Sequence, residues 1–101
     1  MSISATRRAA KNQPCTVRLP GVCKPTPDHE TSVLAHLPHG GMGAKRGDHA
    51  AAFCCFECHE YLDGRKHADP PFEKGFLEYS HLRGVMETQD KLVKMGLLWT
   101  R

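Results

Sequence analysis

Apolar residues recur at helical spacing toward the C-terminal end of the chain. This spacing places side chains on one face of an α-helix, and it predicts one long helix over about residues 72–95. The preceding Asp-Pro-Pro sequence is expected to begin the helix and Gly96 to end it, with residues 97–99 folding back as an apolar clasp. Gly75 and Gly84 weaken the helix intrinsically, and we expect them to permit close packing. The apolar positions are Phe76, Leu77, Leu82, Val85, Met86, Leu92, Val93 and Met95.

Shorter elements are predicted upstream of this helix. Residues 15–30 contain prolines that indicate a loop, and residues 31–37 form a short β-prone run that Pro38 ends. Asp48 is placed to cap a short element that extends through Phe53. Residues 55–64 suit a helix whose first turn carries two cysteines. The mixture of short strand and helices predicts an α+β domain.

The length of 101 residues is that of one domain. We interpret residues 1–14, which include Arg7 and Arg8, as a flexible basic arm, and residues 15–101 as a single folded domain. A domain of this size buries limited apolar surface and often depends on a metal or on disulfides. The formal net charge of +3 is compatible with a polyanionic partner without establishing one. The chain has no apolar run that could cross a membrane.

The cysteines point to a metal rather than to disulfides. The first residues lack the apolar segment of a secretory signal, so the expected location is the cytoplasm, where thiols stay reduced. The odd number of five cysteines favours the same interpretation.

Two separated cysteine pairs predict one structural Zn²⁺ site. Cys55 and Cys58 have the usual two-residue gap, and a Leu-Pro-Gly turn can bring Cys15 and Cys23 together. A closed shell of four thiolates leaves no place for a substrate, so this ion would stabilise the fold only. One alternative is a set of reduced structural cysteines without metal. Another replaces one thiolate by a different donor, and the candidates are Cys54, which is otherwise the spare cysteine, His29 and His59.

Two histidines near this site are candidates for chemistry. His36 lies on the predicted strand, and His59 directly follows the second cysteine pair. Asp63 comes four residues after His59, so the two share a helix face and could hold one divalent ion such as Mg²⁺. Hydrolysis of a phosphodiester needs an activated water and a metal that stabilises developing charge. His36 would act as the general base.

The order of these residues resembles zinc-stabilised HNH endonucleases of the ββα-metal class. More closely, several stretches that together cover nearly the whole chain resemble the YbcO family of phage- and prophage-encoded nucleases. These stretches are Cys15-Thr16-Val17-Arg18-Leu19-Pro20-Gly21-Val22-Cys23, Val33-Leu34-Ala35-His36-Leu37-Pro38, Gly40-Gly41-Met42-Gly43 and Cys58-His59 with Asp63-Gly64-Arg65.

This resemblance implies a zinc-stabilised ββα-metal core, with His36 as general base and His59 as a ligand of the catalytic metal. The chain departs from the HNH pattern in having Ala35 where many such enzymes have an aspartate, and in lacking an asparagine before the second cysteine pair. In the HNH pattern that asparagine holds the hairpin and orients the general base, and the resemblance implies that Asp48 or His49 would take this role. The resemblance also implies phage or prophage DNA processing or recombination in a bacterial host, with a host recombinase as a candidate partner.

DNA is the expected substrate, and basic side chains around the predicted cleft would contact its phosphates. The alternative function is a non-catalytic zinc module that binds nucleic acid or a protein partner and does not need His36. A redox function for the cysteines is disfavoured because a thioredoxin-like βαβ context is missing. The candidate phosphate contacts are Arg7, Arg8, Lys45, Arg46 and Arg65.

Overall fold

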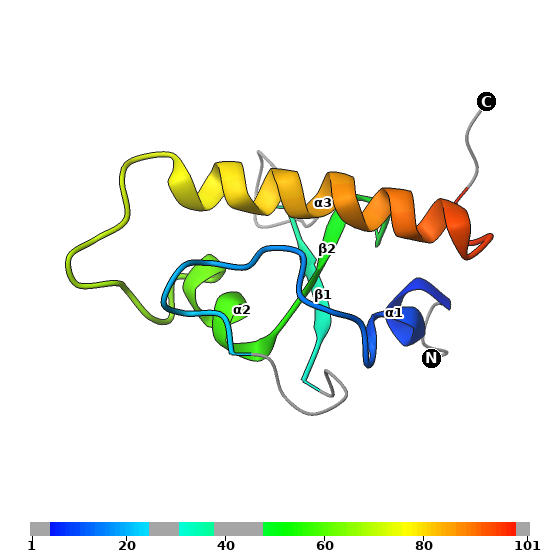
Figure 1. Ribbon diagram of the computed structural model, residues 1–101, viewed down its shortest axis with the longest axis horizontal. Helices are drawn as coiled ribbons and strands as arrows, with labels where there is room; N and C mark the ends of the chain where they lie inside the picture. The colour runs from blue at the N-terminus through cyan, green and yellow to red at the C-terminus, as the bar shows by residue number, and fades with distance from the viewer. Residues whose placement is uncertain (1–4, 25–30, 38–47, 99–101) are drawn as a thin grey trace, which may run out of the picture.

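The computed structural model describes residues 5–24, 31–37 and 48–98. A long helix lies across a hairpin of two strands, and the helices of residues 5–10 and 56–62 lie on the other side of the hairpin from it (Figure 1). In chain order the elements are α1 (Ala5–Ala10), β1 (Val33–His36), the 3₁₀ helix η2 (Asp48–Ala50), β2 (Ala51–Cys54), α2 (Phe56–Leu62) and α3 (Phe76–Lys94).

The hairpin is antiparallel, with Val33 opposite Cys54 and His36 opposite Ala51. The Leu37 amide extends the pairing by donating a hydrogen bond to the Ala50 carbonyl at 2.9 Å. Every residue of β2 is buried, so its apolar run does not alternate with polar residues as a half-exposed strand does. Because this alternation is absent, the sequence pattern predicts only a short element there and does not identify it as a strand.

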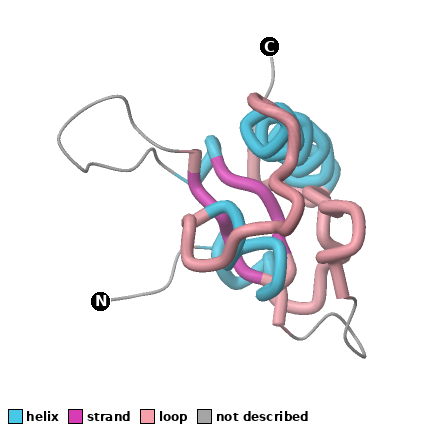
Figure 2. Tube along the Cα trace, turned by 90° about the vertical axis from the view of Figure 1, so that its left-hand side faces the viewer, coloured by secondary structure: helices cyan, strands magenta, loops and turns pink. Residues whose placement is uncertain are grey.

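The two faces of the hairpin bury separate apolar clusters. Neighbouring residues of a strand point to opposite faces, so Ala52 packs in one cluster with Val17 and Val85, while Phe53 packs in the other with Leu92. The cysteine-rich loop therefore lies on one side of β2, and both clusters reach α3, which Figure 2 shows beside the strands.

The N-terminal segment differs from the predicted flexible arm. Residues Ala5–Ala10 form helix α1, and Ala10 is buried against Phe53 and Leu92. Small alanines let this short helix approach the core closely, while the side chains of Arg7 and Arg8 remain on its exposed surface. The structure thus gives residues 5–10 as helix, and the division into a basic arm and a folded domain stays a prediction.

Helix α3 begins later than predicted and ends as predicted. Its N-cap is Gly75, whose φ of 85° lies in the left-handed region that favours glycine, so the helix starts at Phe76 rather than near residue 72. At the other end the Gly96 amide donates to the Val93 carbonyl, and the Leu97 amide donates to the Leu92 carbonyl. This is the Schellman pattern of a glycine C′ residue. Leu97 and Leu98 pack on the core, whereas Trp99 lies outside the described residues.

Gly84 brings α3 close to β2. A Cβ atom at this position would lie 3.0 Å from Thr16 Oγ1 and 3.3 Å from the Cβ of Ala52. A side chain there would require its neighbours to shift by a few tenths of an ångström, which confirms the expected role of Gly84 in close packing. Within the described part of the chain, no helix is long and apolar enough to cross a membrane.

Candidate functional site

Four cysteines meet between the 15–23 loop and the start of α2. Their sulfur atoms all lie within 4.8 Å of one another. Cys55 is the N-cap of α2, and its sulfur accepts a hydrogen bond from the Cys58 amide one turn later. On the other side of the cluster, the amides of Val22 and Cys23 both bond to the Leu19 carbonyl, which closes the turn between the first two cysteines.

This arrangement fits a structural Zn²⁺. Tetrahedral zinc with Zn–S distances of about 2.3 Å separates its sulfurs by about 3.8 Å, and the sulfurs of Cys23 and Cys55 are 3.8 Å apart. Backbone amides also point at the sulfurs, since the Arg18 amide lies 3.4 Å from Cys15 Sγ and the Leu19 amide lies 3.4 Å from Cys58 Sγ. Such donors stabilise the negative charge of thiolate ligands.

The acid–base properties of the cluster favour a bound cation. Burial, followed by the charges of Cys15 and Cys55, raises the pKa of the Cys23 thiol to about 12. Hydrogen bonds from Cys54, Cys55 and Cys58 lower the pKa of Cys15. Four thiolates held this close together need a metal charge to offset their repulsion.

The remaining cysteine and the alternative donors are not members of the four-sulfur ligand group. Cys54 is fully buried, and its sulfur donates to the Cys55 carbonyl at 3.3 Å. Neither Cys54 nor His59 joins the ligand group found among the described residues, and His29 lies outside them.

Ion pairs and hydrogen bonds attach the cysteine loop to α3. The guanidinium of Arg18 makes a bidentate contact with the Glu87 carboxylate at 2.9 and 2.8 Å. Arg83, one turn before Glu87, donates to the Val17 carbonyl at 2.6 Å. These contacts join the cysteine loop to the long helix.

His59 and Asp63 share a face of α2, as their spacing predicted. The Nε2 atom of His59 lies 3.4 Å from Oδ2 of Asp63, and the side chains are about three-quarters buried. Arg65 also approaches this carboxylate, with Nη2 3.6 Å from Oδ2. The pair offers two donors to a cation. The described residues contain no third donor that completes a metal group with them.

A buried histidine for which the sequence predicts no role lies on α3. The Nε2 atom of His81, on α3, is 2.8 Å from the carbonyl oxygen of Ala35, the residue before His36. Burial lowers the pKa of His81, and the charges of His59, Asp63 and His36 all act on it. His36 at the end of β1 and His59 on α2 therefore both lie within electrostatic range of this ring. A sequence signal existed, because His81 shares the buried helix face of Val85.

Other predicted site residues lie at the surface or outside the described part. Arg7 and Arg8 are exposed on α1, and Arg65 is exposed just after α2. Asp48 begins η2, but its side chain is not among the described parts, and Lys45 and Arg46 are outside the described residues.

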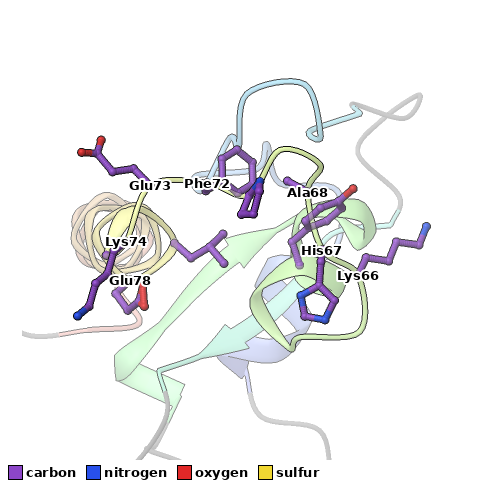
Figure 3. Close-up of a pocket in the computed structure, with 11 residues that line it drawn as sticks. Lys66, His67, Ala68, Phe72, Glu73, Lys74 and Glu78 are labelled. Atoms are coloured by element: carbon purple, nitrogen blue, oxygen red, sulfur yellow. The ribbon is translucent and has the colours of Figure 1, made fainter.

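A cavity of about 470 Å³ opens between the end of α2 and the start of α3 (Figure 3). Lys66 and His67 lie on its α2 side, and Glu73 and Glu78 on its α3 side. Its wall includes Tyr61, which is two residues after His59 and so points to nearly the opposite side of α2. The cavity is therefore separate from the His59–Asp63 pair, and its acidic side chains offset its basic ones.

Comparison with known proteins gives the family. A family model described as "Putative nuclease YbcO" matches residues 4–97. The chain is 38% identical over 95 residues to "Putative nuclease YbcO" of Escherichia coli strain K12, and the match covers 91% of this chain and 94% of that protein. A protein of Enterobacteria phage 82, "Putative nuclease ybcO", matches with the same values.

A solved structure supports the same relationship. It is described as "Structure of a putative bacteriophage protein from Escherichia coli str. K-12 substr. MG1655", and it has 37% sequence identity and a TM-score of 0.73 with this chain. The superposition covers 91% of this chain and all of the other. With a match that spans nearly its full length in both sequence and structure, this chain belongs to the YbcO family.

Proposed function

We propose that this protein is a divalent-metal-dependent endonuclease that hydrolyses phosphodiester bonds in DNA. The observation that carries the proposal is the pairing of His59 with Asp63 on α2, 3.4 Å apart and directly after Cys58 of a cysteine cluster that fits zinc. The family's name, which describes a nuclease, agrees with it. The order β1–β2–α2, with the histidine on the first strand and the ion-pair histidine on the helix, supports placement among HNH-like ββα-metal enzymes.

The proposal assigns different ligands to two metals, one structural and one catalytic. Cys15, Cys23, Cys55 and Cys58 hold a structural Zn²⁺ that fixes the start of α2. His59 and Asp63 hold Mg²⁺ or another divalent ion, with Asp48 as a further candidate in the site. When bound, this ion would stabilise the charge that develops on the phosphate and on the leaving oxygen.

His36 is the proposed general base. A neutral ring nitrogen of His36 takes a proton from the attacking water as the water oxygen bonds to phosphorus. The bond between phosphorus and the leaving sugar oxygen breaks, and that oxygen takes a proton from solvent. The scissile phosphate is held by nearby cations, for which Arg65 is the nearest described candidate because it already reaches Asp63. Arg7, Arg8, Lys45 and Arg46 are proposed as further phosphate contacts.

We propose a phage or prophage setting in the cytoplasm of a bacterial host, with DNA processing or recombination as the role and a host recombinase as a candidate partner. The relatives from Escherichia coli and a phage support this setting.

The alternative function is a non-catalytic zinc module that binds nucleic acid or a protein. It is favoured by one observation: the Asp63 carboxylate already faces both His59 and Arg65, which compete with a cation for it. Position 35, where a carboxylate could add to the site, is alanine.

Cleavage of supercoiled plasmid by zinc-loaded protein separates these functions. We expect nicking with added Mg²⁺ or Mn²⁺, no nicking with chelator at a concentration that leaves zinc bound, and a loss of at least about 100-fold in His36→Ala and in His59→Ala. His67→Ala, which removes an exposed histidine from the 63–75 loop, is the matched control and should cleave normally. If pure wild-type protein cleaves no form of DNA with any of the metals, the endonuclease function is rejected and the non-catalytic zinc module remains.

A further inference from the structure

His81 connects α3 to the strand that carries His36. It is only 6% exposed, and its Nε2 atom lies 2.8 Å from the Ala35 carbonyl oxygen. A carbonyl oxygen can only accept a hydrogen bond, so Nε2 of His81 carries the proton and donates it. Burial disfavours the charged form of the ring, so the donor is a neutral imidazole with one fixed tautomer.

The bond acts on the backbone immediately before His36. The Ala35 carbonyl and the Cα atom of His36 belong to one planar peptide unit. Fixing the direction of that carbonyl therefore fixes the plane from which the His36 side chain leaves the strand. β1 ends at His36, and the following described pairing is the single Leu37–Ala50 bond.

The rest of the packing makes His81 a rigid support. Gly84, one turn further along α3, lets the helix press against Ala52, and Ala52 pairs directly with Ala35 across the hairpin. The donor on α3 and the acceptor on β1 are therefore held at a fixed separation by the same contact. The charges of His59, Asp63 and His36 all act on the His81 ring, which therefore lies within electrostatic range of the proposed reaction centre.

We propose that His81 is a positioning residue, which holds the peptide plane before His36 so that the His36 ring faces the His59–Asp63 pair. Its effect on cleavage rests on the proposed function, whereas its effect on the geometry of His36 does not. This hydrogen bond fixes the direction of the His36 side chain. Without it, a residue within the hairpin would have to orient the base.

Substitutions at His81 distinguish positioning from simple stabilisation. His81→Gln retains a side-chain N–H near the place of Nε2, while His81→Leu and His81→Asn remove the contact, the second because its amide is too short. Thr88→Val on the same helix is the matched control, since it removes a buried hydroxyl that bonds Phe53 and Thr16 but does not touch β1. All four are measured as zinc-loaded protein at a temperature where each is folded.

We expect His81→Leu and His81→Asn to lower kcat for plasmid nicking by about 10- to 100-fold with KM nearly unchanged, because misplacing a catalytic group affects the chemical step. His81→Gln should keep most of the activity, and Thr88→Val should keep normal kcat despite lower stability. Normal kcat in either contact-free variant would overturn the proposal. Equal loss in Thr88→Val and the contact-free variants would overturn it too.

A second readout is independent of cleavage. In the NMR spectrum of zinc-loaded protein, His81→Leu or His81→Asn should shift the Ala35 carbonyl carbon and the ring signals of His36, while His81→Gln and Thr88→Val leave the His36 ring nearly unchanged. If wild-type protein cleaves no DNA, the proposed function fails, and these shifts alone decide the role of His81. His36 signals that stay in place when the contact is removed would overturn that role even in an active enzyme.

Discussion

The hydroxyl of Thr16 lies 3.1 Å from the hydroxyl of Thr88, and this buried contact joins the cysteine loop to the long helix. The same Thr16 oxygen lies within hydrogen-bond distance of the Phe53 carbonyl on β2 and the Gly84 carbonyl on α3. The Thr88 oxygen in turn accepts from the Phe53 amide. One polar cluster thus holds together the cysteine loop, the strand before α2 and the helix that carries His81.

Removing the hydroxyl of Thr16 should destabilise the fold. Thr16→Val leaves buried polar groups with fewer partners, so we expect a loss of about 1–3 kcal/mol in the free energy of unfolding, measured by urea denaturation with zinc bound. Thr16→Ser, which keeps the oxygen, is the control and should lose less. Equal losses in the two variants would mean that the methyl group, and not the hydrogen bonds, matters at this site.

Zinc should bind once per chain and depend on four particular cysteines. We expect one equivalent by atomic absorption in wild type and in Cys54→Ser, since the Cys54 sulfur is outside the ligand group. Cys58→Ser should lose the metal and the cooperative melting transition, because metal binding and folding are coupled. Retention of a full equivalent by Cys58→Ser, or loss of it in Cys54→Ser, would contradict the assignment.

Adding a methyl group at Gly84 should separate α3 from the hairpin. The new Cβ would lie 3.0 Å from Thr16 Oγ1 and 3.1 Å from Val17 Cγ2. We expect Gly84→Ala to lower stability by about 1–3 kcal/mol, although alanine is the better helix former by about 1 kcal/mol. Asp90→Ala, an exposed change on the same helix, should alter the unfolding midpoint little. A stabilised Gly84→Ala protein would show that helix and sheet are not in close contact there.

The pKa of His81 should make stability fall in mild acid. Burial lowers this pKa in the folded state, so the unfolded chain binds the proton more readily. The stabilising contribution is therefore complete above the unfolded pKa of about 6.5 and is lost as pH falls below it. We expect thermal melts between pH 7.5 and 5 to show a steeper decline in wild type than in His81→Gln, which does not titrate. Parallel curves for the two proteins would contradict this.

Arg65 should contribute to DNA affinity without sequence preference. If its guanidinium contacts a phosphate, Arg65→Gln should weaken binding to all duplexes and reduce the slope of log affinity against log salt by about one unit. Lys94→Gln, at the C-terminal end of α3, is the charge-matched control. An unchanged salt slope for Arg65→Gln would remove Arg65 from the DNA interface.

The sequence pattern predicted those parts of the molecule that depend on local spacing. The two cysteine pairs, the helix face shared by His59 and Asp63, and the glycine that ends α3 are all set by residues within a few positions of one another. Such features follow from helical geometry and turn chemistry and need no knowledge of the whole fold.

The parts that were missed depend on tertiary packing. Alanines in α1 form a helix because the cluster around Phe53 and Leu92 accepts Ala10, which the polar composition of the segment does not reveal. His81 was left without a role because its acceptor, the Ala35 carbonyl, is 46 positions away along the chain. Backbone acceptors carry no sequence signature, so only the folded structure identifies this contact.

The central claim is that His36 and His59 face one divalent cation that is distinct from the zinc of the cysteine cluster. Titration of Mn²⁺ into zinc-loaded protein with labelled histidines tests it most directly, because the paramagnetic ion broadens NMR signals of nearby nuclei. The account predicts that the ring signals of His59 and His36 broaden together, that Asp63→Asn suppresses both effects, and that diamagnetic Mg²⁺ causes no broadening. If His36 stays sharp while His59 broadens, or if neither responds, the two imidazoles do not share a metal site and the proposed reaction centre is wrong.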